Sequence, residues 1–205
     1  MATPERYHHG DLRRVLIQAA LELIDESGLE CCTLREVTRR AGVSHAAPYH
    51  HFADRSALIA AVATENLRLL ADSLRRAGRR ARGGGDARVT ALGVAYVRFA
   101  AEHPARFRML LRPEQRAGEG DNLRAGGLAI EATFREAVNA GVEDGTLAVN
   151  DVEAATIAVW SAFHGLAGLR LDGPLATRTR PATAERLARG VAASLREGLR
   201  PAAAE

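Results

Sequence analysis

Apolar residues recur at helical spacing along most of the chain, which predicts an all-α fold. The first apolar stripe, within residues 12–23, is expected in a helix capped by Asp11, running to about Ser27 and closed by Gly28. Similar stripes and caps predict further helices, about nine in all, over residues 33–41, 45–51, 55–77, 86–102, 104–110, 123–140, 151–171 and 181–198. Gly141 is expected to close the seventh helix, and the Arg- and Gly-rich residues 79–85 to form a linker.

The two shortest predicted helices flank a glycine-containing turn. Thr33 and Glu36 have the spacing of a capping box, Gly42 ends the first short helix, and Ser44 is placed to cap the second. Such a pair is typical of a helix-turn-helix unit, whose second helix enters the DNA major groove. The pattern therefore predicts a three-helix DNA-binding head over residues 1–54 and a larger helical ligand-binding and dimerisation domain over residues 55–205.

The run TLREVTRRAGVSHAAPYHHFADR over residues 33–55, followed by Ala57-Leu58, resembles the TetR family of transcriptional regulators. The resemblance implies a dimer that binds a palindromic operator in double-stranded DNA. It implies DNA contacts from Thr33, Arg35, Ser44, His45, Ala46, Tyr49, His50, His51 and Arg55. Arg55 stands where the family usually has a phosphate-binding lysine. Ala47 departs from the family, which often has a hydroxyl residue there, so the operator sequence does not follow from the resemblance.

Net charge adds little support for this head. The 28 basic residues are all arginine and the net charge is +3, but residues 1–55 carry 7 arginines against 8 acids. The prediction therefore depends on the register of the motif. Five of the seven histidines lie within residues 8–51 and supply further donors. The His8-His9 pair is read either as an arm for the minor groove or as a flexible leader.

The second half of the chain contains an apolar helix that must be buried on all sides, because residues 154–169 carry no Asp, Glu or Arg. Its small residues predict that this helix and the last helix pack closely against the same two helices of a second subunit. The interface candidates are Ser161, Gly165, Gly168, Leu187, Val191 and Leu195. The pattern Trp160-x-x-x-His164-Gly165 resembles a TetR subgroup with a Trp-His-Gly signature. Trp160 and His164 share one helix face and line either a ligand pocket or the dimer seam. The other pocket candidates are Tyr96, Phe99, Phe107, Met109 and Leu110.

These features together predict a repressor that a small, largely apolar effector releases from its operator. A ligand-independent regulator or an activator of the same fold remains the alternative. The chain has no Gly-rich phosphate loop and no nucleophile motif, so an enzyme is not expected. Cys31 and Cys32 lack zinc-site spacing and are expected to be semi-buried packing residues, so neither a metal nor a cofactor is expected. No uncharged apolar run reaches 18 residues and residues 1–10 are polar, so we expect a cytoplasmic protein without a membrane span.

Overall fold

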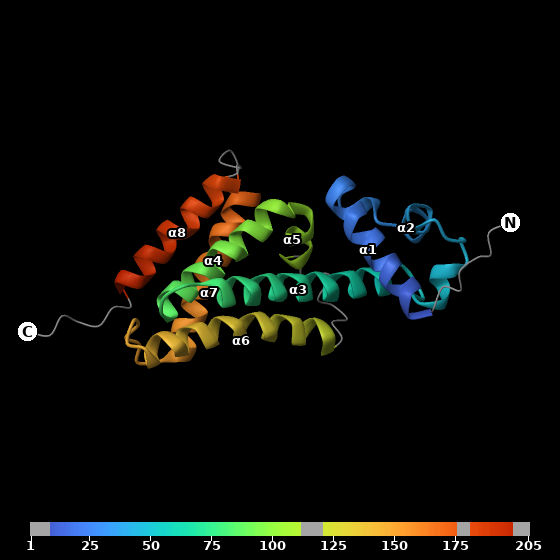
Figure 1. The fold of residues 1–205 in the computed structure, drawn as a ribbon. Helices are drawn as coiled ribbons and strands as arrows, with labels where there is room; N and C mark the ends of the chain where they lie inside the picture. Colours follow the sequence, from blue (N-terminus) through green and yellow to red (C-terminus); the bar gives the residue numbers. More distant parts are fainter. Residues whose placement is uncertain (1–8, 112–120, 176–180, 199–205) are drawn as a thin grey trace, which may run out of the picture.

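The structure is a computed structural model that describes residues 9–111, 121–175 and 181–198, and within these ranges it contains helices and no strand (Figure 1). The elements are α1 (His9–Ser27), η1 (Leu29–Cys31), α2 (Leu34–Ala41), η2 (Ala47–His50), α3 (Arg55–Arg80), α4 (Gly85–Glu102), α5 (Pro104–Leu111), α6 (Asp121–Glu143), α7 (Val152–Leu171) and α8 (Pro181–Gly198). The all-α prediction is confirmed. Eight of the described elements are α-helices, and η1 and η2 are short 3₁₀ segments.

The helix expected over residues 45–51 is instead the single 3₁₀ turn η2. Pro48 has no amide to donate to the carbonyl of Ser44, and this carbonyl accepts the Ala47 amide at 3.0 Å instead. Tyr49 and His51 likewise donate to carbonyls three residues back. The expected cap is also wrong, because Ala46 occupies the N-cap position and makes no side-chain cap bond. Proline chemistry therefore tightens this segment into a 3₁₀ turn.

Three other helix starts are capped as the sequence predicts. The side chains of Thr33, Asp54 and Asp151 accept the amides of Glu36, Ala57 and Ala154 at 3.2, 2.8 and 3.0 Å. Only half of the capping box forms, since the Glu36 carboxylate binds Arg39 rather than reaching back to residue 33. Gly42 ends α2 in the left-handed conformation, with φ of 66°.

Several helix boundaries and one connection differ from prediction. α1 begins at His9, two residues before Asp11, and α6 continues through Gly141 to Glu143. The expected linker is shortened at both ends, because α3 continues to Arg80 and Gly85 begins α4, where its amide donates to Asp144 Oδ2 at 2.7 Å. A Cβ on Gly85 would lie 2.0 Å from the Gly141 backbone nitrogen. Two glycines therefore allow α4 and α6 to approach each other closely.

Two apolar clusters form the core, and α3 runs through both (Figure 1). The head cluster joins α1 and α2 to the first turns of α3, as far as Ala63. The body cluster joins the rest of α3 to α4, α6, α7 and α8. The head core thus extends past residue 54, although the division of the chain at that residue stays a prediction. Helix α5 lies between the clusters, since its Met109 packs in the head cluster and its Phe107 in the body cluster.

Helix α7 is long and apolar enough to cross a membrane on length and composition alone, and it is the one such helix in the described part of the chain. A third of its most apolar window is buried, and the helix packs against α4, α6 and α8. The side of α7 that faces away from these helices leaves Ile157 45% exposed and Leu169 48% exposed. The expectation that this helix is buried on all sides therefore does not hold within one chain.

Candidate DNA-binding surface and ligand cavity

Most of the predicted DNA contacts lie on one exposed surface of the head. Arg35, His45 and Tyr49 line a shallow depression together with Leu34 and Thr38. Tyr49 is 63% exposed, whereas tyrosine side chains are more often largely buried. The remaining exposed candidates are Thr33, Ser44, Ala46, His50 and Arg55. The α2–η2 junction therefore presents a cation, an imidazole and a phenol to one shallow hollow.

Arg55 and His51 lie in different surroundings from the other candidates. The Arg55 guanidinium donates to the carbonyls of Cys32 at 2.8 Å and Leu29 at 2.9 Å, so it ties the start of α3 to η1. The Cys32 thiol is fully buried, and burial raises its pKa to about 11 while the charge of Arg55 opposes the rise. Cys31 is exposed, so only Cys32 packs as expected. His51 is half-buried beside Phe52, with ring centroids 6.4 Å apart.

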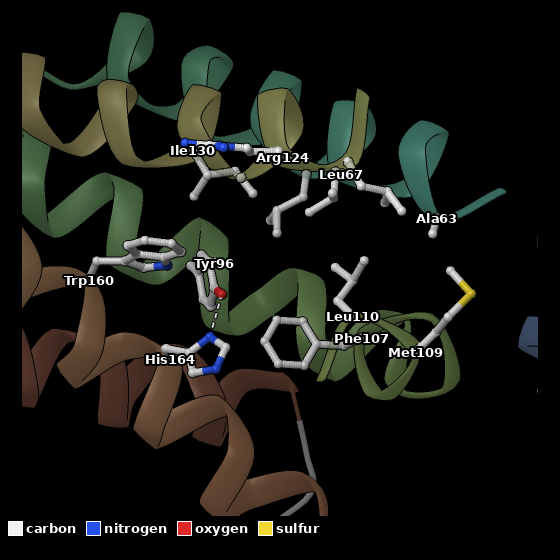
Figure 2. Close-up of a pocket in the computed structure, with 13 residues that line it drawn as sticks. Ala63, Leu67, Tyr96, Phe107, Met109, Leu110, Arg124, Ile130, Trp160 and His164 are labelled. Atoms are coloured by element: carbon white, nitrogen blue, oxygen red, sulfur yellow. Dashed lines mark hydrogen bonds between the residues drawn. The ribbon is translucent and has the colours of Figure 1, made fainter. Parts of the chain in front are cut away.

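The body contains a cavity of about 220 Å³ between α3, α4, α5, α6 and α7 (Figure 2). Six pocket candidates line it, namely Tyr96, Phe107, Met109, Leu110, Trp160 and His164. Phe99 does not line it, because its ring packs against His103 with centroids 5.1 Å apart. The other lining residues are Ala63, Leu67, Leu70, Leu123, Arg124, Gly127 and Ile130. Trp160 and His164 therefore belong to the cavity wall, and both are half-buried.

One end of the cavity carries its polar groups. The Tyr96 hydroxyl and His164 Nδ1 share a hydrogen bond of 2.8 Å, drawn dashed in Figure 2. Burial raises the pKa of Tyr96 to about 12, and the indole N–H of Trp160, which faces the phenol but lies outside hydrogen-bond geometry, partly opposes this rise. This indole nitrogen is itself buried and makes no hydrogen bond within the described part of the chain. The phenol therefore stays protonated at neutral pH, beside an indole donor that has no acceptor among the described residues.

Helix α5 connects this cavity to the head through one aspartate on α1. Asp25 Oδ2 accepts from Arg106 at 2.6 Å and lies 2.9 Å from His103 Nδ1. The Arg106 backbone carbonyl in turn accepts from the buried Asn66 amide on α3 at 3.0 Å. The next residue, Phe107, lines the cavity. The cavity wall and the anchor of the head are thus adjacent residues of one short helix.

The dimer candidates on α7 neighbour the cavity-lining Trp160 and His164 along the helix and lie toward its exposed side. Ser161 and Gly165 are exposed, Gly168 is half-buried, and a Cβ on either glycine would meet no atom within 4 Å. The α8 candidates Leu187, Val191 and Leu195 are half-buried and pack partly against the body core. An apolar face with space for a close neighbour therefore remains uncovered in the single chain.

Comparison with known families accounts for both parts of this arrangement. Residues 16–62 match the family described as bacterial regulatory proteins, tetR family, and residues 89–195 match the tetracyclin repressor-like C-terminal domain. The chain belongs to the TetR family. Membership in the subgroup with the Trp-His-Gly signature stays a prediction.

Solved structures agree with this assignment. A Rhodococcus sp. RHA1 protein of unknown function is 31% identical, with a TM-score of 0.82 over 96% of this chain and 100% of that one. The TetR family transcriptional regulator PfmR from Thermus thermophilus is 25% identical, with a TM-score of 0.63 over 92% of this chain and 96% of that one. The fold also matches the regulator FadR from Bacillus subtilis, solved with stearoyl-CoA, at 13% identity and a TM-score of 0.72 over 91% and 98%. The chain is therefore a TetR-family transcriptional regulator, and members of this family in general bind DNA and small-molecule effectors.

Sequence reasoning missed two walls of the cavity in this TetR-family chain. Leu67 and Leu70 lie on α3, and Arg124 and Ile130 on α6. Their helical spacing marks them as inward-facing, but the same spacing is shared by ordinary core positions. Arg124 is different, because it is exposed and yet lines the cavity, and an exposed arginine in the sequence gives no sign of a cavity.

Proposed function

We propose that this TetR-family regulator is a homodimeric repressor that leaves its palindromic operator when a small, largely apolar effector enters the body cavity. The observation that carries the proposal is the position of α5, whose Phe107 lines the cavity while the preceding Arg106 binds Asp25 of the head. An effector that moves this helix must strain its bonds to α1 and α3. The protein then binds its ligand as a signal and does not transform it.

The DNA contacts are proposed for the depression at the α2–η2 junction. Arg35 is suited to a bidentate contact with guanine, and the Tyr49 hydroxyl to a phosphate oxygen. The other exposed candidates, Thr33, Ser44, His45, Ala46 and His50, surround them. Arg55 already holds two carbonyls and is proposed to orient the head, with its remaining N–H groups directed to phosphate. Half-buried His51 is proposed as a minor contact.

The dimer is proposed to form through α7 and α8. A two-fold axis would bring the exposed Ile157, Gly165 and Leu169 of one chain against the same residues of its partner. The four helices then bury the apolar face of α7 against protein, which favours a soluble protein of the cytoplasm over one held in lipid. Two heads related by this axis match the two half-sites of a palindrome.

The DNA step is tested by selecting operators from random duplexes at a stated salt concentration. Arg35→Ala is expected to lower affinity for the selected operator roughly 5- to 150-fold, because a bidentate guanine contact contributes about 1–3 kcal/mol. Tyr49→Phe is expected to weaken binding less. The control is Arg135→Ala, which removes an exposed arginine of α6 that pairs with Glu131. Failure to enrich a palindrome, or equal losses in the Arg35 and Arg135 variants, would contradict the proposed surface.

The dimer is tested by sedimentation equilibrium of the full chain. Ile157→Arg is expected to convert the dimer to a monomer, because it places a charge at the centre of the proposed apolar interface. Val142→Arg is the matched control, since Val142 is also an exposed aliphatic residue but lies near the end of α6. A wild-type monomer, or an Ile157→Arg variant that remains dimeric, would exclude this interface.

A further inference from the structure

The cavity proposed as the effector site separates its polar groups from its apolar walls. Trp160, Tyr96 and His164 cluster at one end (Figure 2). The centroid of the His164 ring lies 6.5 Å from that of Trp160 and 6.1 Å from that of Tyr96. Aliphatic side chains of α3, α5 and α6 form most of the remaining wall, among them Leu67 and Ile130. A ligand that fits this division has an apolar frame and one polar end.

Two of the three polar groups in this cluster form a hydrogen bond with each other, and the third is a donor without an acceptor. Tyr96 and His164 satisfy each other at 2.8 Å, whereas the buried indole N–H of Trp160 has no acceptor in the described part of the chain. A buried donor without an acceptor costs about 1–3 kcal/mol. A ligand that brings an acceptor atom to this position removes the penalty, and a hydrocarbon of the same shape does not.

We propose that the effector is an apolar molecule with a carbonyl or carboxylate oxygen that accepts the hydrogen bond of Trp160 Nε1. The inference depends on the proposed function, in which this cavity holds the effector. The apolar part of the molecule lies against Leu67, Ile130 and Phe107. If the oxygen belongs to a carboxylate, Arg124 supplies the balancing charge, because it is the single charged side chain among the lining residues that the structure describes.

The cavity also limits the size of the enclosed part of the ligand. A cavity of roughly 150 Å³ holds benzene. On that scale the 220 Å³ found here encloses about nine non-hydrogen atoms. Propylbenzene, acetophenone and benzoate all have about this size and differ in the acceptor that they carry. They are therefore matched probes for the hydrogen bond and for the charge.

The test measures binding of these three probes to the full chain by calorimetry. Acetophenone is expected to bind wild-type protein at least about fivefold more tightly than propylbenzene, the effect of one satisfied buried donor. Trp160→Phe keeps an aromatic ring but removes the N–H, so it is expected to reduce this preference to less than about twofold. Arg124→Gln is expected to weaken the binding of benzoate more than that of acetophenone if the oxygen is that of a carboxylate.

A second measurement reports on the donor directly. Trp160 is the one tryptophan of the chain, so the protein has a single indole N–H signal in a nitrogen-correlated NMR spectrum. Acetophenone is expected to shift this proton downfield and propylbenzene to leave it nearly in place. This signal also shows whether the wild-type cavity is occupied, independently of the stability of any variant.

The outcomes separate this inference from the proposed function. Equal binding of acetophenone and propylbenzene, with both releasing operator DNA, would overturn acceptor recognition and leave the effector cavity standing. Binding of all three probes without any effect on DNA would overturn the effector role. Absence of binding by all three would overturn both. A fivefold preference that survives in Trp160→Phe would assign the acceptor contact to another group and refute the inference.

Discussion

The ion pair between Asp25 and Arg106 is expected to couple the head to the body, and a double-mutant cycle measures this coupling. Asp25→Asn removes the carboxylate charge with little change of shape. Arg106→Met removes the guanidinium and keeps an extended apolar chain. Neither substitution touches the Asn66 bond, because that bond is made to the backbone carbonyl of Arg106. The cycle therefore isolates the side-chain pair that joins α1 to α5.

The expected magnitude follows from burial. The Arg106 side chain is 10% exposed and that of Asp25 is 26% exposed, and Arg106 Nε is buried without a partner among the described residues. Breaking a fully buried pair costs about 3–5 kcal/mol, because the remaining charge has no compensation. Water reaches part of Asp25, so we expect a smaller loss for Asp25→Asn and an interaction energy of about 2 kcal/mol.

A matched pair on the same helix serves as the control. Arg108 of α5 binds Asp172 at 2.7 Å, but their side chains are 41% and 59% exposed. The cycle of Arg108→Met and Asp172→Asn is expected to give less than about 1 kcal/mol, as exposed ion pairs do. Both cycles use urea denaturation followed by circular dichroism at one protein concentration, since the stability of a dimer depends on concentration.

A small interaction energy would refute the coupling role of this ion pair. An interaction energy below about 0.5 kcal/mol for Asp25 and Arg106 would mean that the two substitutions act additively. A value no larger than that of the exposed pair would have the same consequence. In either case the contact between α5 and α1 would be explained by apolar packing, and the ion pair would carry no coupling.

Three further predictions concern stability. The folded pKa of Cys32 is raised to about 11 from 9.0, so the unfolded chain loses this proton first, and the free energy of unfolding should fall as pH rises from 9.0 toward 11. Cys32→Ala should remove that part of a stability-against-pH curve, and parallel curves would contradict it. Gly93→Ala would place a Cβ 2.0 Å from the Phe163 ring and should destabilise by about 1–3 kcal/mol in denaturant titration, whereas a neutral result would show that the ring moves freely. Asp54→Ala should lower stability by about 1 kcal/mol through loss of the cap on α3, with Asp54→Asn nearly neutral in the same assay; equal losses would contradict a capping role.

Local rules predicted the helices of this chain because each rule depends on neighbours in sequence. Apolar spacing placed the long helix from residue 55, which the structure extends to Arg80, and the caps at Thr33, Asp54 and Asp151 form as expected. The tightening of residues 47–50 into a 3₁₀ turn was accessible in principle, since the missing amide of Pro48 is a property of the sequence.

Contacts between distant segments did not follow from these rules. Arg55 satisfies the carbonyls of Leu29 and Cys32, and nothing in its local sequence distinguishes this role from a phosphate contact. The Gly-rich residues before α4 looked like a linker, although Gly85 is packed against Gly141, more than fifty residues away in the chain. The lining of the cavity was likewise only partly predictable. Trp160 and His164 are unusual residues for an apolar helix, whereas the leucines of the cavity wall have the spacing of ordinary core residues.

The proposed switch requires little energy, so in this proposal a small cavity is sufficient to control a DNA-binding head. An effector that changes operator affinity 5- to 150-fold supplies a coupling of about 1–3 kcal/mol. This is the range expected for the Asp25–Arg106 interaction alone, so weakening one link between α5 and α1 is enough. Because Phe107 follows Arg106 directly in the chain, a ligand that shifts the backbone at Phe107 also shifts Arg106 and its bond to Asp25. The same backbone is held to α3 by Asn66, and α3 is the helix on which the head core is built.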